Sequence, residues 1–386
     1  RITSYFLILI ILFPIVWKCK FFIILEMKVL LAPQIGNISY SLMTRQLIPL
    51  LLEKEITVGV CALDKMSSKV SFFPALPVRS PFFNFGAENR AHEEWMYSCG
   101  QMSEKYLKAD VETFLESIED FKPDILVCMD RPACLIAGLL TKTPWSCFVQ
   151  YAMYKKAVFP SHCMHGLNKV LSSYGLEQEL SLHALYSKAK RRIGFGPVQT
   201  SPFHAEEDIT RIGSMCPVTH KKPRTNKLCL YFTEIKNGGK ALEKIISSAY
   251  LGAPYQVYAC YPGCTSKQDG NIRYLSRIDT ELMKDAVAFI HDGNDFLYNQ
   301  AITAGLPQIM ISNHEYVRSY DALSLERNHA GIFLDEADLS MASLYETYRE
   351  LITDDQFYEQ AQLLRQETLK EKDISQFIDF LYIDTL

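Results

Sequence analysis

The stretch "KVLLAPQIGNISYSLMTRQLIPLLLEKEITVGVCAL" (residues 28–63) decides the fold. Its first and last segments, 28–33 and 57–63, are short apolar runs of the kind that form buried strands. Residues 39–55 between them carry the continuous apolar face of a helix. A strand, a helix and a second strand in this order form a βαβ unit, which predicts a parallel sheet with a right-handed crossover.

The same alternation continues through the first half of the chain. Residues 72–100, rich in proline and aromatic side chains, are expected to be irregular. After them the pattern predicts helices and strands in turn: a helix at 101–121, a strand at 124–130, a helix at 133–141, a strand at 145–151, helical stretches between 164 and 190, and a last short run at 193–197.

A polar segment divides the chain into two arrays of similar size. "PVTHKKPRTNK" (217–227) has two prolines and no apolar period, so it is interpreted as a linker. A second alternation of strands and helices follows, and residues 336–382 are expected to be helical. The prediction is an α/β protein of two doubly wound Rossmann-like domains, 27–216 and 228–386. Ligands of such sheets lie beyond the carboxyl ends of the strands, here in a cleft between the domains.

The first 26 residues do not fit this pattern. They are strongly apolar, are interrupted by "KCK", and are followed by "MKVLLAP", which resembles a natural start at Met27. We expect residues 1–26 to be an extension outside the fold, with a hydrophobic anchor or signal-like segment as the alternative. The expected location is cytoplasmic, with membrane association through residues 1–26 under that alternative.

The net charge and the cysteine spacing argue against nucleic-acid binding and against a metal site. The chain has 386 residues, of which 48% are hydrophobic and 22% charged, and a formal net charge of -4. This balance gives no overall attraction to nucleic acid, and none is expected as a partner. The 11 cysteines include no CxxC pair, and "SHCMHG" (161–166) lacks an evident fourth ligand. Buried free thiols and no metal site are therefore predicted.

The segment "FIHDGNDFLYNQAITAGLP" (289–307) predicts a strand, a glycine turn and a helix. The strand ends at His291, Gly293 permits a tight turn, and the helix begins near Asp295. Free N–H groups at a helix start favour an anion. The simpler interpretation is a plain turn with Asp295 as the helix N-cap.

In this context the chain resembles a known family of enzymes. "HDGNDFLYNQAITAGLP", "YDALSLERNHAGIFL" (320–334), "PDILVCMDRPACLIAGLLTKTPW" (123–145) and the opening from Met27 match, in order and spacing, motifs of the GT-B nucleotide-sugar glycosyltransferases of the UDP-glucosyl/glucuronosyl and macrolide type. The likeness spans residues 27 to about 370. It implies a GT-B fold, with an acceptor-binding first domain and a donor-binding second domain.

The resemblance implies a catalytic pair in the first domain. The family's base histidine falls on Asn37, which cannot titrate, and the aspartate that supports that histidine falls on Asp130. Asp130 is expected to be the base itself, a remnant without a partner, or only a strand-end cap.

The resemblance also implies a donor site in the second domain. His291 would contact the diphosphate, together with the backbone at Gly293, Asn294 and Asp295. Aspartates at 292 and 295 would repel that diphosphate by about 1–4 kcal/mol at 4 Å.

Further donor contacts follow from the same alignment with the family. Asn299 replaces a glutamate that binds ribose, and Arg318 falls on one of two sugar-binding positions. Asn237 and Gly238, before a helix, stand where the family has a second donor loop.

The function implied by the resemblance is transfer of a sugar from a nucleotide-sugar to a hydroxyl of a small, apolar acceptor, with inversion and without an obligatory metal. The donor, a UDP- or dTDP-sugar, is a co-substrate, and no other cofactor is expected. Because several motif residues are substituted, the alternative is a catalytically inactive relative that binds or activates a partner protein.

Overall fold

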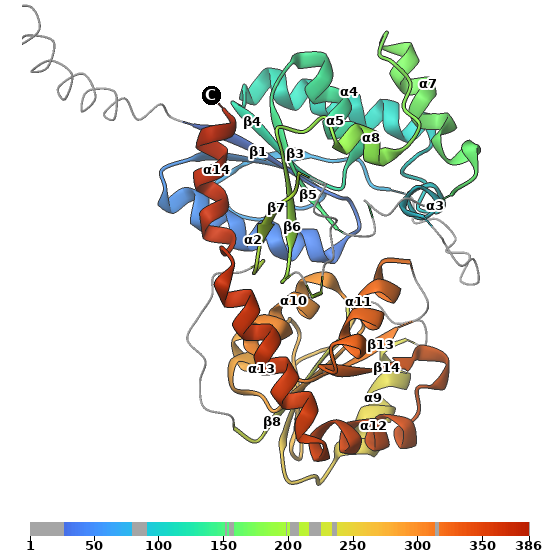
Figure 1. Cartoon of the computed structure of the whole chain (residues 1–386), viewed down its shortest axis with the longest axis vertical. Coiled ribbons are helices and arrows are strands. Elements are labelled where there is room, and N and C mark those ends of the chain that lie inside the picture. The colour runs from blue at the N-terminus through green and yellow to red at the C-terminus, as the bar shows by residue number, and fades with distance from the viewer. Residues whose placement is uncertain are drawn as a thin grey trace, which may run out of the picture.

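The computed structural model describes residues 27–78, 91–150, 153, 158–197, 199–200, 208–215, 225–233, 238–312 and 316–385. These residues form two seven-stranded sheets, one in each half of the chain (Figure 1). Residues 1–26, most of the predicted linker and Asn237 lie outside this part of the chain. None of the helices in the described residues is long and apolar enough to cross a membrane.

The first sheet is parallel throughout and has the order β3-β2-β1-β4-β5-β6-β7. Its strands are β1 (Lys28–Pro33), β2 (Thr57–Ala62), β3 (Ser71–Pro74), β4 (Ile125–Met129), β5 (Trp145–Val149), β6 (Arg191–Phe195) and β7 (Thr210–Ile212). The helices of this half are α2 (Ile38–Glu53), α3 (His92–Ser98), α4 (Glu104–Phe121), α5 (Pro132–Thr141), α7 (His165–Ser173) and α8 (Leu182–Tyr186), with the 3-10 helix η1 (Ser161–Met164) before α7. The strand order reverses at β1, so the carboxyl ends of β1 and β4 flank the expected binding edge.

The second sheet has the order β10-β11-β9-β8-β12-β13-β14, and only β10 and β11 pair antiparallel. Its strands are β8 (Lys227–Tyr231), β9 (Gln256–Cys260), β10 (Lys267–Asp269), β11 (Ile272–Tyr274), β12 (Ala288–His291), β13 (Gln308–Ser312) and β14 (Gly331–Asp335). The remaining helices are α9 (Gly239–Tyr250), α10 (Asp295–Ala304), α11 (Tyr316–Arg327), α12 (Met341–Thr353), α13 (Asp355–Lys370) and α14 (Phe377–Asp384), and the 3-10 helices are η2 (Thr280–Asp285), η3 (Glu336–Asp338) and η4 (Ile374–Gln376).

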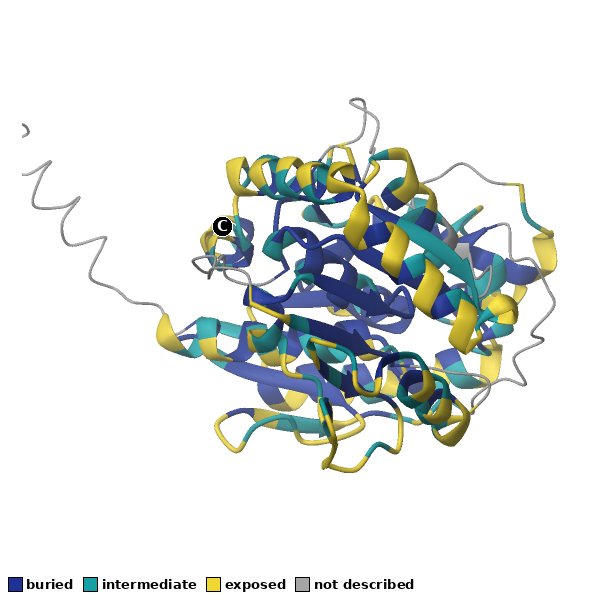
Figure 2. Ribbon diagram, turned by 90° about the horizontal axis from the view of Figure 1, so that it is seen from below, coloured by how far each residue is buried: buried dark blue, intermediate teal, exposed yellow. Residues whose placement is uncertain are grey.

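Burial explains why the central strands formed where the sequence predicted them. All five residues of β4 and of β5 are buried, and Figure 2 shows buried strands in the interior with exposed residues on the outer helices. Strands that are buried on both faces have continuous apolar sequences, which can be recognised without the structure. The α/β prediction of two Rossmann-like sheets is confirmed.

The region expected to be irregular, 72–100, is partly ordered. β3 pairs with β2 at the sheet edge, and α3 begins at His92. Neither element has a clear hydrophobic pattern in the sequence. β3 is an edge strand of four partly exposed residues, and α3 is only seven residues long. The short strands β7, β10 and β14 were not predicted for the same reason.

The last helix returns to the first sheet, although residues 228–386 were assigned to the second domain. Phe377 packs its ring 4.9 Å from that of Phe148 in β5. The Asp384 carboxylate accepts from Ser146 Oγ at 2.8 Å and from Arg191 Nη2 at 2.7 Å. Figure 1 shows α14 lying beside the first half of the molecule. Burial of this apolar helix face on β5 therefore connects the two halves a second time.

Candidate functional site

Asp130 directly follows β4, in a strained backbone conformation. Its φ is 55°, in the left-handed region that non-glycine residues seldom adopt, and its side chain is buried. Such strain persists only where the surroundings hold the residue in place, and it concentrates at functional sites.

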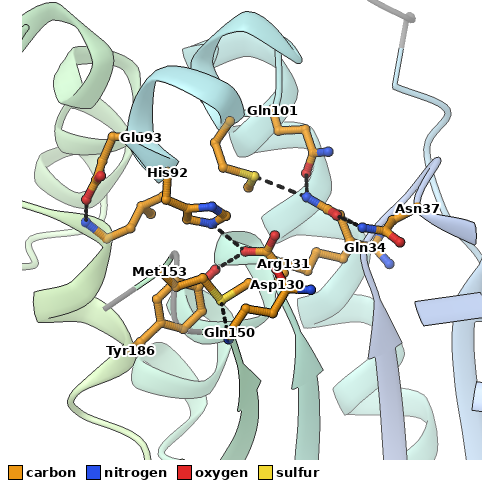
Figure 3. A network of polar contacts seen from close by, with 12 residues as sticks. Gln34, Asn37, His92, Glu93, Gln101, Asp130, Arg131, Gln150, Met153 and Tyr186 are labelled. Atoms are coloured by element: carbon orange, nitrogen blue, oxygen red, sulfur yellow. Dashed lines mark hydrogen bonds and ion pairs between the residues drawn. The ribbon is translucent and has the colours of Figure 1, made fainter. Parts of the chain in front are cut away.

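Two side chains from other elements reach the same oxygen of Asp130. His92 Nε2 lies 2.9 Å from Asp130 Oδ1, and the Tyr186 hydroxyl donates to that atom at 2.6 Å. His92 is the first residue of α3 and Tyr186 the last of α8, so three separate elements converge here (Figure 3). Sequence reasoning missed this pair, because the contact depends on how α3 docks against β4.

The His92 ring has one nitrogen in use and one without a partner. Since a carboxylate only accepts, Nε2 donates to Asp130, and the buried Nδ1 has no hydrogen-bond partner. Burial lowers the pKa of His92, but the charge and hydrogen bond of Asp130 and the charge of Glu93 outweigh it, so the pKa is raised. The ring stacks on Trp95 with centroids 5.7 Å apart. His92 is therefore a basic imidazole with a free acceptor atom.

Asn37, at the position of the family's base, is a helix cap. Its Oδ1 accepts from Tyr40 N at 3.3 Å at the start of α2, and its Nδ2 donates to Gln34 Oε1 at 2.9 Å. Gln34 Nε2 in turn lies 3.1 Å from Met96 Sδ in α3. The described hydrogen bonds of Asn37 thus run to the loop after β1 and to α2, and the contact with Asp130 is made by His92.

A buried ion pair fixes the strand ends beneath this network. Arg131 Nε and Nη2 contact Asp110 Oδ2 and Oδ1 at 3.0 and 2.6 Å, and Nη1 donates to Cys61 O at 2.7 Å. The guanidinium also lies 4.5 Å from the centre of the Phe114 ring. This bidentate arrangement holds the residue next to Asp130 rigidly.

His291 is in the predicted turn but shapes the backbone there. The side chain is fully buried, and its Nδ1 accepts from Gly293 N at 3.1 Å. Burial lowers the pKa of His291 to about 4, although the charge of Asp292 opposes this. The ring is therefore neutral near pH 7. Because the N–H of Gly293 already donates to this ring, that N–H is not available to a ligand.

Gly293 has the conformation that the turn requires. Its φ is 78°, and an added Cβ would lie 3.1 Å from Met310 Sδ and 3.3 Å from Arg318 Cγ. The predicted donor residue Arg318 therefore lies against this turn.

Asp292 and Asn294 tie the turn to the loop after β8. Asp292 Oδ2 accepts from the backbone N and the Oγ1 of Thr233, at 2.7 and 2.8 Å. Asn294 Nδ2 donates to the same hydroxyl at 3.4 Å, and Asn294 Oδ1 caps α10 by accepting from Leu297 N. The N-cap is thus Asn294 and not Asp295, and the Asp292 carboxylate bonds to protein N–H and O–H groups.

Asp295 connects the two sheets. As the first residue of α10 it accepts a hydrogen bond from the side-chain amide of Gln150, which directly follows β5. Burial, followed by the charge and hydrogen bond of Asp295, raises the pKa of Asp321 well above its ordinary value, while Arg318 lowers it. The interaction with Asp295 therefore favours the protonated form of Asp321.

Tyr40 links the two groups of residues. Burial and then the charges of Asp130 and Asp295 raise its pKa well above the ordinary value, and its buried hydroxyl has no hydrogen-bond partner. The network of the first half and the α10 turn of the second half are therefore neighbours, with the neutral Tyr40 phenol close to both.

The remaining predicted donor residues are Asn299, Gly238 and Asn237. Asn299 is buried and its Oδ1 accepts from Met215 N at 2.9 Å, which fastens α10 to the segment after β7. Gly238 precedes α9 with a φ of 74° and is exposed, and Asn237 is outside the described residues. Within the described ranges no group of three or more His, Cys, Asp or Glu could hold a metal, and the nine cysteines there are free.

Comparisons with known proteins find likeness in structure alone. No protein-family model and no curated protein sequence matches the chain. Among solved structures, CalG4, the calicheamicin glycosyltransferase, superposes with a TM-score of 0.70 at 15% identity, over 93% of this chain and 98% of that one. The spinosyn rhamnosyltransferase SpnG complexed with spinosyn aglycone gives 0.70 at 16% identity, over 92% and 100%.

A third structure agrees with these two. Glycosyltransferase SsfS6 of Streptomyces sp. SF2575, complexed with thymidine diphosphate, gives a TM-score of 0.68 at 15% identity, over 92% of this chain and 99% of that one. The match over nearly the whole length of both chains, together with the two sheets and their strand order, shows that this protein has the GT-B fold.

Proposed function

We propose that this protein transfers a sugar from a nucleoside-diphosphate sugar, a dTDP- or UDP-sugar, to a hydroxyl group of a small apolar acceptor, with inversion at the anomeric carbon. The observation that carries the proposal is the meeting of the two halves. Gln150, at the carboxyl end of β5, bonds to Asp295 at the start of α10, and Asp130 lies at the carboxyl end of the neighbouring strand β4.

The donor diphosphate would bind at the α10 turn. The start of a helix with its unpaired N–H groups attracts an anion, and the basic residue Arg318 lies against Gly293 through its Cβ and Cγ atoms. Solved structures of the same fold support this choice of ligand. The spinosyn rhamnosyltransferase SpnG and the glycosyltransferase SsfS6 have each been solved in complex with thymidine diphosphate. The acceptor would bind on the side of the first sheet, near Asp130 and Tyr40.

Aspartates at the turn weaken the donor site without abolishing it. Two hydrogen bonds from Thr233 offset part of the charge of Asp292, and the hydrogen bond from Gln150 offsets part of the charge of Asp295. We therefore expect nucleotide binding in the micromolar to millimolar range typical of enzyme substrates.

A binding screen tests the proposal. Purified protein is melted in the presence of dTDP, UDP, ADP and GDP and of the corresponding sugar nucleotides. A ligand at about 100 times its Kd stabilises the folded state by about 2.7 kcal/mol, which raises Tm by several degrees. A rise with dTDP or UDP supports the proposal, and no rise across the panel overturns it. Binding without sugar transfer to any acceptor would instead identify a catalytically inactive relative.

A further inference from the structure

We propose that His92, oriented by Asp130, is the general base of the transfer reaction, and that its Nδ1 takes the proton of the acceptor hydroxyl. The inference rests on the proposed function and assigns the basic group that Asn37 cannot supply. It makes α3, and not the loop after β1, the source of the base.

The orientation of the ring carries the inference. Nε2 is committed to Asp130 Oδ1 at 2.9 Å, so Nδ1 carries the lone pair. That nitrogen is buried and has no hydrogen-bond partner. A buried polar atom left unpaired costs about 1–3 kcal/mol, and a bound hydroxyl would remove this cost by donating to Nδ1.

Neighbouring residues hold the ring in this orientation. Tyr186 donates to the same Asp130 oxygen at 2.6 Å, which fixes the carboxylate. Glu93 Oε1 accepts from Leu182 N at 2.9 Å, which fastens α3 to α8 at the point where His92 begins the helix. Trp95 stacks on the imidazole. Asp130, Tyr186 and Glu93 are thus positioning residues.

The tyrosines near Asp130, and His291 in the turn before α10, are unsuited to accept a proton. Burial raises the pKa of Tyr40 and of Tyr186 well above ordinary values, so both phenols remain protonated. The pKa of His291 is lowered to about 4, and its Nδ1 already accepts from Gly293. Asp130 itself accepts from two donors. His92 differs from all of these in having a raised pKa and a free acceptor atom.

The proposed sugar transfer makes one bond, breaks one bond and moves one proton to His92. The acceptor oxygen forms a bond to the anomeric carbon of the donor while the bond from that carbon to the diphosphate oxygen breaks. The electron pair of the broken bond leaves with the nucleoside diphosphate. The hydroxyl proton passes to His92 Nδ1, and the resulting imidazolium is stabilised by the Asp130 carboxylate, to which it still donates through Nε2.

The test compares His92→Gln with the unaltered protein and with His165→Gln, a matched change at an exposed histidine of α7. Nucleoside diphosphate affinity and sugar transfer are measured for each. We expect His92→Gln to lower kcat by about 10²–10⁴-fold, while the Kd for the nucleoside diphosphate changes by less than about threefold. His165→Gln should change neither.

A second variant separates a base from a structural histidine. In Asp130→Asn the charge that raises the pKa of His92 is gone, so the acid limb of the kcat/KM profile should move to lower pH. The groups facing His92 are Asp130, Glu93 and Tyr186, and only the first is changed. Added imidazole should restore part of the activity of His92→Ala, because it can occupy the space of the lost ring.

The outcomes are distinct. Equal transfer by His92→Gln and the unaltered protein overturns the base assignment and leaves the proposed function in place. Parallel loss at every pH in Asp130→Asn, with no imidazole rescue of His92→Ala, also overturns the assignment. An unaltered protein that binds no nucleotide and transfers no sugar overturns both.

Discussion

Gln150 and Asp295 join the two sheets where their strand ends face each other, through a hydrogen bond from the amide of one to the carboxylate of the other. The Asp295 carboxylate carries a negative charge at the start of α10, where a donor diphosphate would bind. The same side chain therefore holds the halves together and opposes the expected ligand.

Replacing Asp295 with Asn should strengthen nucleotide binding. Asn keeps an oxygen that accepts from Gln150 and removes a repulsion of about 1–4 kcal/mol. We expect the Kd for dTDP or UDP to fall about tenfold, measured by titration calorimetry. The control is Asp355→Asn, the corresponding first residue of α13. Unchanged or weaker binding by Asp295→Asn would show that the diphosphate does not lie at this helix start.

The Asp110–Arg131 pair should be critical for stability. Both side chains are buried, and Asp110→Ala leaves the guanidinium without its bidentate partner. We expect the free energy of unfolding, measured in urea, to fall by about 3–5 kcal/mol. Lys169→Ala, which removes the partner of Glu104 in an exposed pair, should cost at most about 1 kcal/mol. Equal losses for the two variants would contradict this account.

His291 should make the fold sensitive to acid. Its pKa is lowered from 6.5 to about 4 by burial, so between these pH values the unfolded chain binds a proton that the folded chain does not. Stability is therefore lost as pH falls through 6.5 toward 4, by about 2 kcal/mol between pH 7 and pH 5 from this group.

The check for His291 is His291→Asn, which retains an acceptor for Gly293 N and cannot titrate. Urea unfolding at pH 7 and pH 5 gives the loss of stability for each protein. The loss should be about 2 kcal/mol smaller in the variant. The same pH dependence in both proteins would rule out His291 as its source.

Asp384 should stabilise the first sheet from the far end of the chain. Asp384→Ala removes the carboxylate that accepts hydrogen bonds from Ser146 and from two guanidinium nitrogens of Arg191 in a partly buried ion pair. We expect faster hydrogen exchange in β5 and β6 and a loss of about 2 kcal/mol in the free energy of unfolding. Asp379→Ala, at an exposed position of the same helix, is the control, and faster exchange confined to the second sheet would argue against this role.

The sequence predicted the parts of the fold that depend on local pattern. The helix α10 begins at Asp295 as predicted, because an apolar period, an N-terminal cap and Gly305 at its end mark it. Short edge strands such as β3 and β14 carry too little pattern to be recognised, since only one side of each pairs and their residues are largely half-buried or exposed.

The candidate site was harder to predict than the fold. Asp130 was identified from the resemblance to the glycosyltransferase family, but its partner His92 lies 38 residues earlier in a short helix. The contact exists because α3 docks on α8 and β4, which no local period encodes. Similarly, Asp292 was expected to oppose a phosphate, whereas the fold places Thr233 against it.

The return of α14 to β5 has a consequence for how the protein is made. β5 and Phe148 leave the ribosome more than 200 residues before Phe377, which packs against that ring in the folded chain. Until residues 377–384 emerge, a nascent first sheet would carry an uncovered apolar surface, a species prone to aggregation or chaperone capture. Burial of the apolar surface on β5 thus waits for translation of α14.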